Sequence, residues 1–148
     1  MTEDEIIQHI TGSFDQVHID EDQGNQFFFA GEERKFPFVT LVRGDQYDKA
    51  SDLERPGVYR LNIGVAKETY RGLFGQPPGW AATDGVVDTG HDFTALDQLM
   101  PHPIYAPMGW VCMLAPSVAT FEAVKPLIAG AYEVAMKRQA RKGGDAEW

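Results

Sequence analysis

Four side chains of this sequence have the chemistry that binding sites and active sites use, and they occur in three short segments. Arg60 and Asn62 lie in "GVYRLNIG", His102 lies between two prolines in "PHP", and Cys112 lies in "WVCML". A guanidinium beside an amide can bind a carboxylate or phosphate, an imidazole can transfer a proton near neutral pH, and a thiolate can act as a nucleophile. Their surroundings decide which of these reactions is available.

His102 is a candidate general acid or base by residue type. Each flanking proline restricts the backbone of its neighbour, so we expect a stiff loop in which the imidazole hydrogen-bonds a carbonyl. Acid–base catalysis would also need a nucleophile or substrate nearby, and the chain has no Gly-x-Ser-x-Gly motif. His102 is therefore a catalytic candidate only if Arg60 is its neighbour.

The strand pattern of "GVYRLNIG" places Arg60 and Asn62 on one face, because successive side chains of a strand point to opposite sides. The inward-facing side chains of the same strand are Tyr59, Leu61 and Ile63. Two interpretations remain open for the polar pair: a solvated sheet face, or a ligand-binding pair in a cleft with aromatic walls. The aromatic residues expected to form those walls are Tyr105, Trp110 and Trp80.

We expect no metal site and no bound cofactor. Two histidines and two aspartates lie close in sequence (His91, Asp92, Asp97 and His102), but no His-x-x-x-His spacing places two ligands on one helical face. Neither "GQPPG" nor "ARKGG" fits the strand–loop–helix context of a phosphate-binding loop. The single cysteine excludes an internal disulfide and a Cys-rich zinc site, and its apolar neighbours predict a buried, unreactive thiol.

The charge of the chain is unevenly distributed. The net charge is −9, and residues 1–33 contain nine acidic side chains and no Lys or Arg. Nucleic-acid binding requires cations that neutralise phosphates, and the main basic run is "KRQARK" at residues 137–142. That run is expected to be the cationic end of a carboxyl-terminal helix. The charge pattern therefore disfavours nucleic acid as a partner.

The pattern of apolar residues and turn signals predicts helices and strands in one α+β domain over residues 1–142, with a frayed tail at 143–148. A capping box at Thr2–Glu5 predicts an amino-terminal helix that Gly12 stops, and Ser117 is expected to begin a long carboxyl-terminal helix. Expected strands span 16–19, 25–31, 36–44, 57–64 and 110–114, and two shorter helices are expected at 66–74 and 92–100. These elements predict an antiparallel sheet of about five or six strands packed by the terminal helices.

No signal peptide or membrane span is expected, because the amino terminus lacks a basic segment followed by a long apolar core and no apolar run approaches 18 residues. The expected location is the cytoplasm.

Two longer motifs carry a resemblance to a known family. "ASDLERPGVYRLNIGV" (residues 50–65) and "ALDQLMPHPIYAPMGWV" (residues 95–111) resemble a bacterial domain-of-unknown-function family over nearly the whole chain. The order of elements more distantly resembles the MmcQ/YjbR-like proteins, which are small α+β domains. That wider family has been likened to DNA-binding double-wing folds, but the sheet region here lacks a dense basic stripe. The resemblance thus implies a fold and supplies no function.

These observations predict a non-catalytic module that binds a small molecule or a protein, through the outward sheet face and the loop region between Trp80 and Trp110. One alternative is a small enzyme that uses His102 with Arg60. The other is a nucleic-acid-binding module that uses the basic carboxyl-terminal helix. The sequence identifies neither the partner nor the oligomeric state.

Overall fold

The computed structural model describes residues 1–81 and 85–146. The elements in chain order are α1 (Glu3–Ser13), β1 (Val17–Asp22), β2 (Asn25–Ala30), β3 (Val39–Val42), β4 (Arg60–Gly64), α2 (Lys67–Phe74), β5 (Met100–Pro101), a short 3-10 helix η1 (Ala106–Met108), β6 (Trp110–Leu114) and α3 (Val118–Ala146). The strands form one six-stranded antiparallel sheet in the order β1-β2-β3-β4-β6-β5. The predicted α+β class, with helices from both ends of the chain packed on the sheet, is confirmed.

Helix α1 begins with the predicted capping box. The Thr2 hydroxyl accepts the Glu5 N–H at 3.2 Å, and the Glu5 carboxylate accepts the Thr2 N–H at 3.2 Å. These two bonds satisfy backbone donors that a helix start leaves unpaired. The expected stop is wrong by one residue, because Gly12 lies inside the helix and Ser13 is its last residue.

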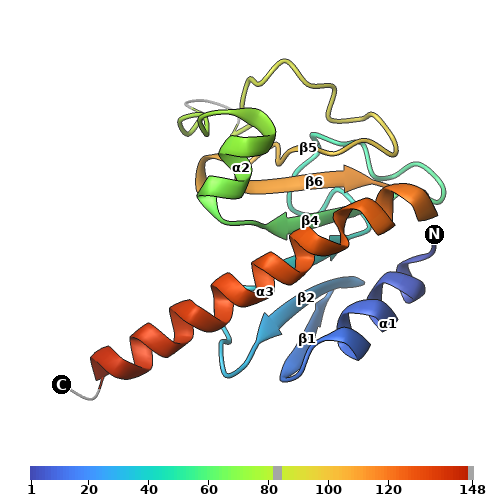
Figure 1. The fold of residues 1–148 in the computed structure, drawn as a ribbon. Coiled ribbons are helices and arrows are strands. Elements are labelled where there is room, and N and C mark those ends of the chain that lie inside the picture. Colours follow the sequence, from blue (N-terminus) through green and yellow to red (C-terminus); the bar gives the residue numbers. More distant parts are fainter. Residues whose placement is uncertain (82–84, 147–148) are drawn as a thin grey trace.

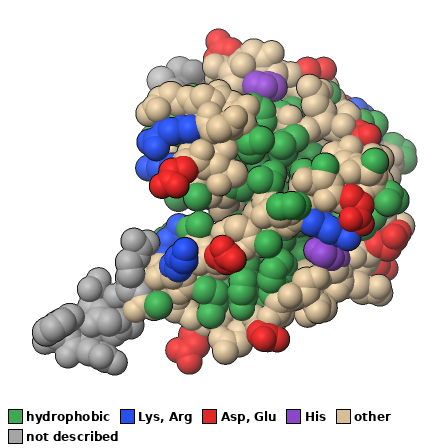
Figure 2. All heavy atoms as spheres, viewed as in Figure 1, with side chains coloured by type: hydrophobic (Ala, Val, Ile, Leu, Met, Phe, Trp, Pro, Cys, Tyr) green, Lys and Arg blue, Asp and Glu red, His purple; other side chains and the backbone are tan. Residues whose placement is uncertain are grey.

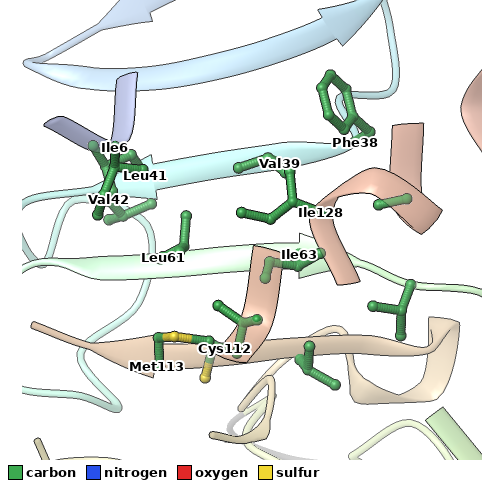
Figure 3. Packing of buried hydrophobic residues seen from close by; sticks show 14 of the residues in the cluster. Ile6, Phe38, Val39, Leu41, Val42, Leu61, Ile63, Cys112, Met113 and Ile128 are labelled. Carbon is green, nitrogen blue, oxygen red and sulfur yellow. The ribbon is translucent and has the colours of Figure 1, made fainter. Parts of the chain in front are cut away.

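Helices α1 and α3 bury the apolar face of the sheet, and Figure 1 shows α3 crossing the strands. In Figure 3, Ile6 of α1 lies beside Leu41, and Ile128 of α3 lies beside Val39 and Ile63. All five side chains are inaccessible to solvent. Because the strands alternate, this packing turns the neighbouring side chains of β3 and β4 to the opposite face.

The helix expected at 92–100 does not form, and that prediction is wrong. The Asp92 carboxylate accepts the N–H and hydroxyl of Thr94, which stabilises a turn instead. Asp97 has a left-handed backbone (φ 55°) and donates its N–H to the Leu114 carbonyl, and β5 then pairs with β6. This pairing covers the free edge of β6, and proline is tolerated there because β5 is itself an edge strand.

The other elements match their predicted positions within a few residues. β6 has the expected bounds, β1 extends beyond the expected 16–19, and β3 is shorter than the expected 36–44. Ser117 caps α3 by accepting the Thr120 N–H, and α3 runs to Ala146, so it includes residues of the expected tail at 143–148, whose last two residues lie outside the described part. Among the helices of the described chain, none combines the length and the apolar character needed to cross a membrane.

Candidate functional site

A cavity of about 500 Å³ lies against the sheet face that α1 leaves uncovered, and it extends to the carboxyl-terminal half of α3. Its lining comes from β2, β3, β4 and β6, from the loops 31–38, 43–59 and 102–109, and from α3. In Figure 2, which is viewed from the α3 side, a hollow lies between the regions that carry α2 and α3 in Figure 1, although α2 contributes no residue to the lining of the cavity. Ligand-binding pockets of small molecules have volumes of about 300–1,000 Å³, so the cavity has a suitable size.

A buried salt bridge lies at the base of this cavity. Arg60 donates from Nη1 to Asp48 Oδ1 at 3.1 Å and from Nη2 to Asp48 Oδ2 at 2.7 Å, while its Nη1 also donates to Ser51 Oγ at 2.9 Å. The Arg60 side chain is 2 % exposed. Burial raises the pKa of Asp48, but the hydrogen bonds and charge of Arg60, together with the Ala50 N–H, outweigh that effect and lower it. The pair is therefore ionised and nearly neutral as a unit.

Arg60, Asn62 and Thr40 form a chain of hydrogen bonds, and in each bond the donor is the group nearer to Arg60. Arg60 Nε donates to Asn62 Oδ1 at 3.0 Å, and Asn62 Nδ2 donates to Thr40 Oγ1 at 2.9 Å. Since a guanidinium can only donate, it fixes the orientation of the Asn62 amide, and the amide in turn makes the Thr40 oxygen an acceptor. The Thr40 hydroxyl hydrogen is thereby left to donate into the cavity.

His102 lines the same cavity with a fixed tautomer. Its Nδ1 accepts the N–H groups of Ile104 and Tyr105, both at 3.0 Å, so the proton of the neutral ring is on Nε2. Burial, reinforced by the charge of Arg60, holds the pKa of His102 well below 6.5. Among the described residues, Gln26 Oε1 is the side-chain polar atom that is both fully buried and without a hydrogen-bond partner. The His102 Nε2–H also has no acceptor among these residues, so it is not fully buried. Because His102 lines the cavity, this N–H reaches the cavity surface.

The contacts of His102 differ from the sequence-based expectation in one respect. The loop is held as predicted, but the imidazole accepts backbone N–H groups rather than donating to a carbonyl. The reason is that the turn through Ile104 and Tyr105 directs these two N–H groups at the ring. We call Thr40, Asp48, Arg60, Asn62 and His102 the polar floor.

The walls of the cavity are mainly aromatic. They are formed by Phe27, Phe29, Phe36, Phe38, Tyr47, Tyr105 and Trp110, with Met108. The Trp110 ring lies against Gly64, its cross-strand partner, where an added Cβ would be 2.8 Å from two ring carbons. The glycine therefore provides the space that the indole occupies. Tyr47 and Tyr105, nearly half exposed, lie where the cavity opens.

Two cations, Lys35 and Arg138, line the part of the cavity next to α3, and we call them the cationic end. The neighbouring Gln139 joins α3 to the turn after β2: its Nε2 donates to the Ala30 carbonyl and its Oε1 accepts the Glu32 N–H, each at 3.2 Å. This contact holds the helix against the segment from which Lys35 extends.

The structure brings five of the six sequence-predicted site residues together. Arg60, Asn62, His102, Tyr105 and Trp110 all line the cavity. Trp80 is not among the lining residues; it is 61 % exposed, with its ring centroid 6.3 Å from that of Tyr105. The solvated-face interpretation of Arg60 and Asn62 is wrong, since each is only 2 % exposed. Loop 43–59 folds over them and supplies Asp48 and Ser51 to Arg60, while Asn62 bonds to Arg60 and Thr40. Their role in binding stays a prediction.

Several residues of this site were not predicted from the sequence, notably Asp48, Thr40, Lys35 and Arg138. For Asp48 a signal existed: a buried arginine requires a carboxylate, and the loop before β4 contains several aspartates. For Thr40 the signal was its position between Val39 and Leu41, because strand alternation places it on the face opposite these two apolar residues. That Lys35 and Arg138 line the same cavity depends on how α3 packs, and no local sequence pattern reveals it.

The remaining candidates lie in separate places. The His91 ring bonds to the Thr89 hydroxyl and packs on Phe74, and Asp97 accepts the Ser117 N–H. Within residues 1–81 and 85–146 no group of three or more potential metal ligands is found. Cys112 is fully buried in β6, and burial raises the pKa of its thiol to about 12.

The fold and the cavity define an α+β protein with one antiparallel sheet, in which aromatic walls surround a floor of hydrogen-bond donors. The chain belongs to a family of unknown function (DUF6194), whose model matches residues 1–144. No curated protein and no solved structure matches it. Membership of a family of unknown function is thus shown, whereas the bacterial origin and the distant resemblance to MmcQ/YjbR-like proteins stay predictions.

Proposed function

We propose that this protein binds a small aromatic molecule that carries a hydrogen-bond acceptor, such as a carbonyl oxygen, directed at the polar floor. The observation that carries the proposal is the direction of hydrogen bonding at the floor. Thr40, Asn62 and His102 each keep a donor hydrogen for which the described residues provide no acceptor. An uncharged acceptor group complements such a surface.

The walls support the aromatic part of the proposal. Phe27, Phe29 and Trp110 line the cavity, and aromatic pairs gain about 0.5–1.5 kcal/mol beyond the burial of their area. Hydrogen bonds within the protein hold the side chains of the floor: Asp48 holds Arg60, Arg60 orients Asn62, and backbone N–H groups hold His102. A preorganised site loses less entropy on binding.

The alternative of a small enzyme retains one supporting observation, because His102 and Arg60 line the same cavity. Arg60, however, is committed to Asp48, Ser51 and Asn62, and His102 Nδ1 is occupied. Neither group offers a lone pair to a substrate, so the His102–Arg60 pair contains no general base. This favours binding over general-base catalysis.

The nucleic-acid alternative depends on residues 137–142, whose last two side chains lie outside the described part. If the protein does not bind to a heparin column at low salt, the nucleic-acid alternative is refuted. A cytoplasmic location also remains part of the proposal.

Binding is tested with 2-acetylnaphthalene and its isostere 2-isopropenylnaphthalene, in which a methylene replaces the carbonyl oxygen. We expect the ketone to bind roughly 2- to 12-fold more tightly in calorimetric titration, as one neutral hydrogen bond predicts. Thr40→Val should reduce the affinity of the ketone and leave that of the alkene unchanged. Thr11→Val, which removes an exposed hydroxyl on α1, is the matched control. Equal affinities for ketone and alkene in the wild type would refute the role of the floor.

A further inference from the structure

We infer that the ligand is an aromatic acid whose anionic group lies at the cationic end, between Lys35 and Arg138, and not at Arg60. The inference rests on the proposed function and adds the charge and the orientation of the ligand. The acceptor of the ligand then faces the polar floor, and its acid group faces α3.

Arg60 is a poor site for the anion although it is the buried cation of the cavity. Both oxygens of Asp48 accept from its guanidinium, and Ser51 and Asn62 take two further donor hydrogens. Four of the five guanidinium hydrogens are therefore used. A ligand carboxylate at this position would also meet the carboxylate of Asp48, and like charges at short range repel. The floor accordingly suits a neutral acceptor.

The cationic end has the opposite character. Lys35 and Arg138 are exposed and line the cavity, and neither forms an ion pair with a carboxylate of the described residues. Glu33 lies nearby, but its carboxylate accepts the N–H groups of Lys35 and Phe36 at 3.0 and 3.1 Å and is not part of the lining. A ligand anion at this end would meet two cations and no lining carboxylate.

The packing of α3 against the turn after β2 determines where these cations lie. Gln139 holds α3 against the turn after β2, where an added Cβ at Gly31 would lie 2.1 Å from Gln139 Oε1. Arg138 is the residue before Gln139 in the helix. The chain as a whole carries a net charge of −9, but charges more than about 8–10 Å away are screened at physiological salt. Of the charged side chains that line the cavity, Asp48 and Arg60 are paired with each other, which leaves Lys35 and Arg138 as the cations available to a ligand anion.

The inference is tested with 6-acetyl-2-naphthoate and its neutral amide, 6-acetyl-2-naphthamide, by calorimetric titration. The acid should bind roughly two- to fivefold more tightly at low ionic strength, as expected for exposed ion pairs, and high salt should remove the difference. Lys35→Gln and Arg138→Gln should each reduce this preference for the acid without changing the affinity of the amide. Arg138→Lys should retain it, and Lys137→Gln, an exposed neighbour outside the cavity, should leave it unchanged.

The outcomes separate this inference from the proposed function. If the amide binds as tightly as the acid and the Gln variants alter neither affinity, the cationic end has no role and only the proposed function stands. If Lys137→Gln reduces the preference as much as Arg138→Gln, the effect belongs to the general field and the inference is refuted. If neither probe nor 2-acetylnaphthalene binds, the proposed function fails, and the inference fails with it.

Discussion

Asp48 and Arg60 form a two-point salt bridge, with N–O distances of 3.1 and 2.7 Å, between the loop that covers the sheet and the strand beneath it. The arginine is 2 % exposed and the aspartate 12 %. Since an unpaired buried charge is costly, the contact fixes the loop 43–59 in place over β4. The same contact directs Arg60 Nε toward Asn62, so it also sets the orientation of the donors at the floor.

Asp48→Asn should lower the free energy of unfolding by about 3 kcal/mol, because it leaves the Arg60 guanidinium buried without a counter-charge. Urea denaturation at pH 7 measures the change. Asp52→Asn is the matched control, since the Asp52–Arg55 pair in the same loop is exposed, with an N–O distance of 3.7 Å. Loss of the Asp52–Arg55 pair should lower the free energy of unfolding by less than about 1 kcal/mol. Equal effects of the two substitutions would contradict the structural importance of the buried pair.

The buried, neutral His102 should make stability depend on pH below 6.5. Its pKa in the folded protein lies well below the 6.5 of an unfolded chain, so the unfolded state binds a proton first as the pH falls. The free energy of unfolding should therefore be highest above pH 6.5 and decrease below it by up to about 1.4 kcal/mol per pH unit. Urea denaturation between pH 7 and pH 5 measures this slope.

His102→Asn isolates that contribution. An asparagine oxygen can accept the Ile104 N–H as an Asx-turn does, so the loop keeps a side-chain acceptor while the titrating group is lost. Burial and the charge of Lys125 also lower the pKa of His9, despite the opposing Glu122, and the variant retains that histidine. The difference between the two pH profiles therefore belongs to His102. Parallel profiles below pH 6.5 would show that His102 is not held neutral by the fold.

Gly64→Ala should disturb the cavity wall and thereby weaken binding. The new methyl group would lie 2.8 Å from the Trp110 ring, so the indole must move away from β4. We expect a destabilisation of about 1–3 kcal/mol, typical of overpacking, together with a loss of affinity for 2-acetylnaphthalene. Gly72→Ala in α2 is the control, because no atom lies within 4 Å of its added Cβ. It should stabilise the helix by up to about 1 kcal/mol without changing binding. Unchanged binding by Gly64→Ala would show that the ring position is unimportant.

Local patterns predicted the elements whose determinants are local. The capping box at Thr2 and the apolar run from Trp110 to Leu114 specify a helix start and a strand through neighbouring residues alone. The helix predicted at 92–100 is wrong because a short apolar run fits both helical and extended spacing. The segment pairs with the free edge of β6 instead of forming a helix, and its own sequence does not specify that contact.

The candidate site shows the same division. Alternation along β4 placed Arg60 and Asn62 on the correct face, because that depends only on strand geometry. The burial of this face could not be predicted, since it requires loop 43–59 to fold back and bring Asp48 to Arg60. That Lys35 and Arg138 line one cavity depends likewise on the docking of α3, across about a hundred residues of sequence.

The Cys112 thiol should be unreactive in the folded protein, although it lies in the strand beside the cavity. Burial raises its pKa to about 12, so almost no thiolate exists at pH 8, and its sulfur lies 3.5 Å from the Pro101 carbonyl, to which it donates. Labelling with a disulfide reagent should be slow in native buffer and complete in denaturing urea. Because reaction then requires opening of the β5–β6 pair, the labelling rate should fall when 2-acetylnaphthalene occupies the cavity and stabilises the fold. Rapid native labelling, unaffected by the probe, would contradict the burial of this strand.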